Sequence, residues 1–149
     1  MSELKTTLEN ALKDAMRSKN DIERRTIRMT LSAIKNAEIE KRVALDDPAI
    51  VAIIQKEIKL RKESIQDATT ANRPDLIADY SAEVEVIEKF LPKQLSADEL
   101  TKIIENVISE IGASAPSDLG KTMKAVMPLV QGKAPGDLVS RIIREKLQG

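Results

Sequence analysis

The sequence predicts an all-α protein, in which an N-terminal helical domain of long helices, residues 1–92, is joined to a three-helix domain, residues 93–149. Apolar residues recur at helical spacing along almost the whole chain, and no stretch of useful length alternates as a strand does. Only Tyr80 and Phe90 are aromatic, so the core must be aliphatic, which favours helix packed on helix. The 149 residues, 42% of them hydrophobic, suffice for two small domains.

The first half of the chain opens with two helices. An apolar stripe at helical spacing predicts a first helix that ends near Ser18. Asn20, with Glu23 three residues later, resembles a capping box and opens a second helix, which runs to about Ala44.

Two further helices are predicted before the segment 90–96, each with a proline in its first turn. The third helix reaches residues 69–72. The fourth is rich in carboxylates and stops at Pro92, because a proline disfavours helix at the residue before it. The residues that open these helices are Asp46 or Asp47 with Pro48 for the third, and Asn72, Pro74 and Asp75 for the fourth.

Beyond the segment 90–96, three shorter helices are predicted, separated by glycines. Ser96 and Glu99 form the clearest capping box in the chain, and Gly112 ends the helix that they open. The other expected boundary residues are Ser117, which caps the sixth helix, Pro128, which kinks it, Gly132, which closes it, and Pro135 with Gly136, which lead into the seventh.

Composition limits the chemistry that the chain can carry. It contains no Cys and no His, which removes disulfides, thiolate nucleophiles, imidazole bases and the usual zinc ligands. We predict no catalytic residue, no metal and no cofactor. The alternative that the composition leaves open is a serine nucleophile paired with a lysine, but Ser117 and Ser140 have simpler interpretations as a helix cap and a surface residue. No apolar run approaches the roughly 20 residues of a membrane span, and the first residues lack the apolar block of a signal peptide. These observations favour a cytoplasmic protein without a membrane partner.

The C-terminal domain contains the better candidate for a binding site. Net charge is zero over the whole chain, but residues 117–149 hold six bases against three acids. Lys121 and Lys124 lie off the apolar stripe of the sixth helix. The turn 132–136 offers a lysine and backbone amides at a helix start, which attract phosphate. The bases that flank this turn are Lys121, Lys124, Lys133, Arg141 and Arg144; alternatively, the glycines only cap helices and the lysines only keep the surface soluble.

A second basic face is predicted on the second helix. At 100 degrees per residue, four bases project within about 40 degrees of one another, opposite the apolar sector. Such a face can follow phosphates, or it is the solvated side of an amphipathic helix. Its members are Arg24, Arg28, Lys35 and Arg42.

Arg61 falls on the apolar side of the third helix, where a charge needs a partner. Glu57 stands four residues earlier, in the favourable order for an ion pair. The pattern favours a half-buried Glu57–Arg61 pair that holds the helix in register. The alternative is an arginine kept for a ligand carboxylate or phosphate.

Three segments resemble the YqeY-like family, also called GatB/YqeY. They are FLPKQLSADEL at 90–100, TIRMTLSAIKNAEI at 26–39 and DLGKTMKAVMPLVQGKAPGDLVSRIIREKL at 118–147, so the similarity covers nearly the whole chain. The family joins an N-terminal helical domain to a domain similar to the tail of GatB, a component of the tRNA-dependent amidotransferase. The resemblance implies a surface that faces tRNA or a partner, made by Gly120, Lys121, Lys124, Gly132, Lys133 and Gly136.

The family name also implies a carbon-nitrogen ligase with glutamine as amide donor, but the resemblance is to the tail of GatB and not to its catalytic domain. The leading hypothesis is therefore a non-catalytic accessory protein that binds tRNA or structured RNA through its C-terminal domain. A second hypothesis is a protein interaction module whose N-terminal helices dock another helical protein. A third is an amidotransferase component that acts with other subunits.

Overall fold

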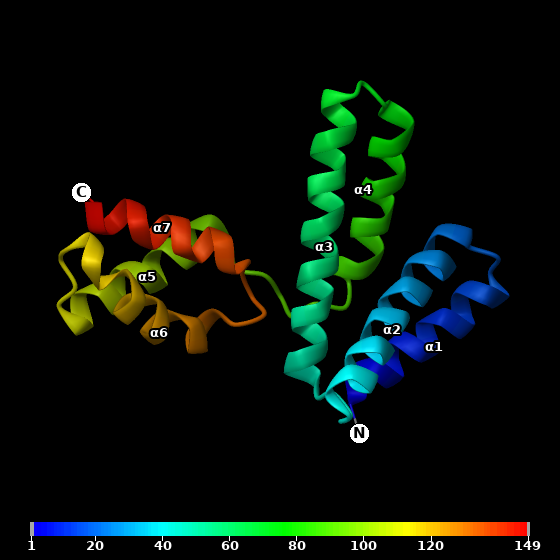
Figure 1. The fold of residues 1–149 in the computed structure, drawn as a ribbon, viewed down its shortest axis with the longest axis horizontal. Coiled ribbons are helices and arrows are strands. Elements are labelled where there is room, and N and C mark those ends of the chain that lie inside the picture. The colour runs from blue at the N-terminus through cyan, green and yellow to red at the C-terminus, as the bar shows by residue number, and fades with distance from the viewer. Residues whose placement is uncertain (1, 149) are drawn as a thin grey trace. The chain divides into compact units, whose positions relative to one another are not determined.

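In the computed structural model, which describes residues 2–148, the chain is all-α, as predicted, and no strand occurs in that range. The chain divides into two compact units, Met1–Leu91 and Pro92–Gly149. The helices are α1 (Glu3–Arg17), α2 (Asp21–Lys41), α3 (Asp47–Thr70) and α4 (Pro74–Glu88) in the first unit, and α5 (Ala97–Ile111), the 3₁₀ turn η1 (Pro116–Asp118), α6 (Leu119–Val130) and α7 (Gly136–Gln148) in the second (Figure 1). No helix in residues 2–148 is long and apolar enough to cross a membrane.

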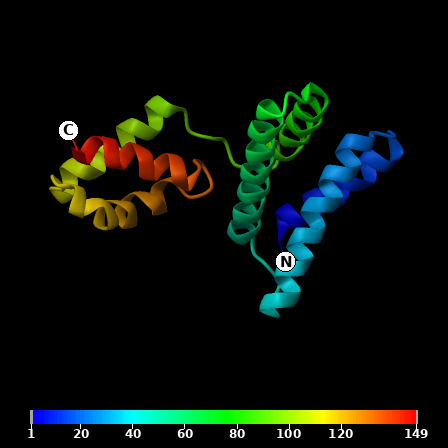
Figure 2. The same cartoon turned by 45° about the horizontal axis from the view of Figure 1, so that its top comes forward.

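The first unit consists of two helical hairpins. Both views show α1 lying beside α2, and α3 beside α4 (Figures 1 and 2), and α2 also packs on α3 and α4. Their shared core is aliphatic and includes Leu8, Ile34, Ile54 and Ile87, all fully buried. Asp47, at the start of α3, accepts a bond from the Ser2 hydroxyl and one from the Leu4 amide at 3.2 Å, which ties α1 to α3.

The turns of the first unit use left-handed residues that are not glycine. Lys19, Arg42 and Asn72 each have a φ of 55–57°, a conformation in which most side chains are strained. Helix α2 ends at Lys41, three residues earlier than the sequence predicts, and Arg42 is its C-cap. Asn72 lies in the turn between α3 and α4, and the N-cap of α4 is Arg73. Asn20 does cap α2, since its side chain accepts a bond from the Glu23 amide at 3.1 Å.

The second unit is a bundle of α5, α6 and α7 around a separate aliphatic core. The predicted capping box is confirmed: the Ser96 hydroxyl accepts from the Glu99 amide at 3.1 Å, and the Glu99 carboxylate accepts from the Ser96 amide at 3.0 Å. Ser117 does not cap the sixth helix, because it lies inside η1. Pro128 lies within α6, two residues before its end.

Candidate functional site

Asp118 arranges the chain before α6 and thereby places Lys121 and Lys124. Its carboxylate accepts the backbone amides of Ser114 at 2.9 Å and Ala115 at 3.2 Å. These hydrogen bonds, with a smaller contribution from the positive charge of Lys121, lower the pKa of Asp118. Lys121 and Lys124 are exposed, and the helix buries Thr122, Val126 and Val130 on its other side.

The Gly132–Lys133 turn is held from within the unit. Gly132 is buried and lies in the turn that follows α6, with a φ of 78°, a conformation that glycine adopts without strain. Its carbonyl accepts a bond from the Gln94 side chain at 2.8 Å. The Lys133 carbonyl accepts from the Leu95 amide at 2.9 Å, and the Lys133 amide donates to Val130 at 2.8 Å. Lys133 is exposed through its side chain, because its backbone amide and carbonyl both form hydrogen bonds within the unit.

The start of α7 is not the open set of amides that the sequence suggests. The Leu138 amide donates to the Asp137 carboxylate at 3.0 Å, and the Val139 amide donates to the Pro135 carbonyl at 3.1 Å. A phosphate placed there would meet the Asp137 carboxylate and the Leu138 amide, which already has an acceptor. Fewer amides are therefore open than the sequence suggests, and the phosphate site at this helix start stays a prediction.

Most basic side chains of this unit remain available to a ligand. Lys124, Lys133, Arg141 and Arg144 are exposed, and none of them forms an ion pair within residues 2–148. Lys146 differs, because it pairs with Glu105 on α5 at 3.0 Å. Among the predicted site residues, those exposed are Gly120, Lys121, Lys124, Lys133, Gly136, Arg141 and Arg144, whereas Gly132 is buried.

The predicted basic face of α2 is divided in two. Arg24 forms an ion pair with Asp21 at 3.1 Å, and the Arg28 guanidinium donates a long hydrogen bond of 4.0 Å to the Met16 sulfur. These two arginines line one shallow groove, which also includes Arg25, a base that the helical projection did not select. Lys35 and Arg42 line another groove, beside α1. Arg42 follows the last residue of α2 in a left-handed conformation, so the four bases do not form one continuous helical row.

Arg61 is a structural residue, as the sequence pattern favours. It is 5% exposed, and its guanidinium donates to the Glu57 carboxylate at 2.8 Å and to the Glu57 carbonyl at 3.1 Å. A second carboxylate, Glu83 on α4, accepts from it at 3.3 Å, and the Met29 sulfur lies at 3.9 Å. Sequence reasoning missed Glu83, because the two residues stand 22 positions apart on different helices and only packing brings them together.

No cluster of three or more His, Cys, Asp or Glu side chains within residues 2–148 is arranged to hold a metal ion. The basic residues of the second unit lie on outward helix faces and at a turn. An exposed set of lysines and arginines can bind an extended anion through charge and direct hydrogen bonds.

A family model described as "Yqey-like protein" matches residues 5–147. Three curated relatives are each named "Altered inheritance of mitochondria protein 41, mitochondrial". One, from Lachancea thermotolerans, is 36% identical over 113 residues, 74% of this chain and 60% of its own length. One from Pyrenophora tritici-repentis is 32% identical over 146 residues, 93% of this chain and 77% of its own length. One from Kluyveromyces lactis is 32% identical over 136 residues, 88% and 71% respectively.

The expectation of a cytoplasmic location is wrong on these comparisons, because the relatives are named as mitochondrial proteins. The sequence tests behind that expectation look for membrane spans and secretory signals. Neither test separates the cytosol from the interior of an organelle, so the composition does not bear on the choice.

Proposed function

The chain belongs to the YqeY-like family, and from that premise we propose that it is a non-catalytic accessory protein that binds structured RNA, in particular tRNA, through the Pro92–Gly149 unit. One observation carries the proposal. Five exposed bases of α6, α7 and the turn between them form no ion pair within residues 2–148, so a polyanion can bind them without first breaking a salt bridge. They are Lys121, Lys124, Lys133, Arg141 and Arg144.

The composition of this unit favours structured RNA over a single strand. Tyr80 and Phe90 are the aromatic residues of the chain, and both precede Pro92. Single-stranded RNA is commonly bound by stacking its bases on aromatic rings, which this unit lacks. A helical RNA is recognised by shape and by contacts to phosphates and 2′-hydroxyls, for which lysine and arginine side chains suffice.

Acidic residues limit where the RNA can contact the unit. Asp137 lies at the start of α7 and Asp118 at the start of α6, so a phosphate near either position is repelled. The proposed contacts are therefore made by side chains along the exposed faces of α6 and α7 and by Lys133 at the turn. Gly120 and Gly136 have open space around them, which lets an RNA backbone approach closely.

Filter binding of labelled tRNA over a range of salt concentrations tests the proposal. The full chain is expected to bind at low salt, with an affinity that falls steeply as salt rises. A Lys121→Ala, Lys124→Ala, Lys133→Ala variant is expected to bind more weakly, with a salt slope reduced by about one for each phosphate that the variant no longer neutralises. Lys102→Ala, an exposed lysine of α5 in the same unit, is the matched control.

Two results would refute the proposal. The first is no affinity for tRNA at low salt. The second is a triple variant whose affinity and salt slope equal those of the Lys102→Ala control. Urea unfolding of each variant checks that the unit remains folded, since all four lysines are exposed and lie outside its core.

A further inference from the structure

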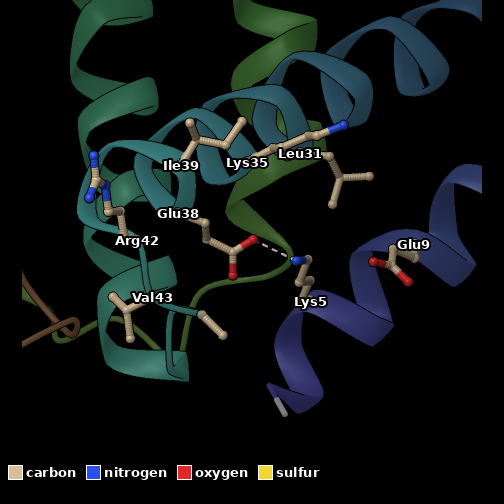
Figure 3. Close-up of a pocket in the computed structure, with 9 residues that line it drawn as sticks. Lys5, Glu9, Leu31, Lys35, Glu38, Ile39, Arg42 and Val43 are labelled. Carbon is tan, nitrogen blue, oxygen red and sulfur yellow. Dashed lines mark hydrogen bonds and ion pairs between the residues drawn. The ribbon is translucent and has the colours of Figure 1, made fainter.

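A groove in the first unit lies between the N-terminal part of α1 and the C-terminal end of α2, and we call it the α1–α2 groove (Figure 3). It encloses about 660 Å³ and is open to solvent. All of the residues that line it belong to the first unit, whereas the bases proposed to bind RNA belong to the second. The groove is lined by Lys5, Glu9, Leu31, Lys35, Glu38, Ile39, Arg42, Val43 and Ala44.

Aliphatic side chains lie exposed along this groove. Ile39 is 64% exposed and Val43 is 56% exposed, and Leu31 is half-buried beside them. Ile39 and Val43 do not contribute to the aliphatic core of the unit. Each large aliphatic side chain left in water lacks the stabilisation that burial gives, about 1.5–3 kcal/mol for a side chain fully buried. A partner that covers them recovers part of that free energy.

The end of α2 holds these side chains in a fixed arrangement. Arg42 adopts a φ of 56°, and the Val43 amide donates to the Glu38 carbonyl at 3.2 Å. The Glu38 carboxylate accepts from the Leu45 amide at 2.9 Å and from the Lys5 ammonium at 2.6 Å (Figure 3). The chain is thus fixed on both sides of Val43, so a ligand meets a preformed surface.

The charged side chains that line the α1–α2 groove indicate which class of partner it can bind. The Lys5–Glu38 pair satisfies two of the five charges that line the groove. Lys35 and Arg42, on the α2 side, form no ion pair within residues 2–148, and neither does Glu9 on the α1 side. The α2 side is therefore basic around an aliphatic centre. Its complement is an apolar stripe with carboxylates along one edge.

We propose that the α1–α2 groove docks an amphipathic helix of another protein, one that presents aliphatic side chains at i and i+4 and carboxylates beside them. The aliphatic side chains cover Ile39 and Val43, and the carboxylates meet Lys35 and Arg42. RNA is a poorer occupant, because phosphates cannot bury Ile39 and are repelled by Glu9.

A second copy of this chain is also a poorer occupant. The most acidic helix of the chain is α4, whose exposed carboxylates include Asp75, Asp79 and Glu85. No large aliphatic side chain of α4 is exposed to fill the groove. The exposed large apolar residues of the described chain lie instead on α1, α2, α3 and α6 and just after α2.

Fluorescence polarisation with synthetic helical peptides tests the inference on the full chain. The probe is an alanine-based peptide with leucines at i and i+4 and glutamates on one flank. One control peptide has lysines in place of the glutamates, and another has serines in place of the leucines. The wild-type chain is expected to bind the glutamate peptide on the order of tenfold more tightly than either control.

Charge reversal of the groove gives the sharper result. Lys35→Glu with Arg42→Glu is expected to invert the preference, so that the lysine peptide binds on the order of tenfold better than the glutamate peptide. Ile39→Ser is expected to weaken both. Lys59→Glu and Leu60→Ser, at exposed positions of α3 outside the groove, are the matched controls and should change neither affinity.

Four outcomes would overturn the inference. One is no binding of the glutamate peptide by the wild-type chain, and another is an unchanged preference after charge reversal. A third is a dimer, measured by sedimentation equilibrium, that Ile39→Ser disrupts, because the groove would then hold a second copy. The fourth is a loss of tRNA binding in Ile39→Ser, which would make the groove part of an RNA surface. Urea unfolding confirms that each variant is folded.

Discussion

Replacement of Arg61 by Met tests the structural role of the buried cluster in the first unit. The Arg61 side chain is 6% exposed, and its carboxylate partners Glu57 and Glu83 are 19% and 8% exposed. Met keeps much of the aliphatic stem but removes the bonds of 2.8 Å to Glu57 and 3.3 Å to Glu83. Glu83 is then a buried carboxylate without its cation, and such a change lowers the free energy of unfolding by about 3–5 kcal/mol.

A double-mutant cycle separates the lost ion pair from the buried charge that remains. Arg61→Met with Glu83→Leu removes both charges, and because an apolar replacement of a buried pair is often neutral, we expect most of the loss to be recovered. Glu57 is the more exposed partner and can turn toward water, so its charge should contribute less to the loss.

Tyr80 makes the measurement specific to the first unit. It is the one tyrosine of a chain without tryptophan, and it lies half-buried on α4. Its fluorescence during urea unfolding therefore reports the first unit, while circular dichroism reports both. Arg73→Met is the control, since Arg73 pairs with Asp75 in an exposed position and its loss should leave the midpoint unchanged. An Arg61→Met variant that unfolds with the same midpoint as Arg73→Met would refute the reasoning.

Two further predictions concern the same unit. The Thr26 hydroxyl is fully buried and has no hydrogen-bond partner within the described chain, so Thr26→Val is expected to raise the free energy of unfolding by about 1 kcal/mol. The control is Thr30→Val, which loses the hydrogen bond of 3.0 Å from the Thr30 hydroxyl to the Thr26 carbonyl. An equal gain in stability in both variants would contradict the prediction. Bonds from Lys5 and then Leu45 lower the pKa of Glu38 in the folded chain, so its contribution to stability is present at neutral pH and is lost as pH falls through that lowered pKa. Glu38→Gln should therefore destabilise the unit at neutral pH, but not in acid, in urea titrations at several pH values, whereas the exposed Glu40→Gln should follow the wild type at every pH.

Local sequence signals predicted the elements of this fold well. The all-α class follows from apolar spacing and an aliphatic composition, and the Ser96–Glu99 capping box and the closing role of Gly132 depend on neighbours a few residues away. The errors fall at turns. Arg42 and Asn72 take the left-handed conformation without being glycine, and Ser117 lies in a 3₁₀ turn, outcomes that depend on where the adjoining helices pack.

For the candidate sites too, features set by helical periodicity were predicted, and features set by turns or by packing between helices were not. The exposed bases of α6 and α7 follow from helical periodicity, because a residue opposite an apolar stripe faces water. Two hydrogen bonds were not predicted, because each depends on the geometry of a turn. They run from the Leu138 amide to the Asp137 carboxylate and from the Leu95 amide to the Lys133 carbonyl. The α1–α2 groove was also not predicted, because its walls come from separate helices.

The sequence by itself determined the helices, their apolar faces, the family and the absence of cysteine and histidine chemistry, because each of these is a property of composition or of residues a few positions apart. Only the tertiary structure decided which charges are satisfied. Glu83 reaches Arg61 and Lys5 reaches Glu38 because helix packing brings distant residues together, while Lys35 and Arg42 remain without an ion pair in the described chain. Whether a charged residue supports the fold or is available to a partner depends on these long-range contacts.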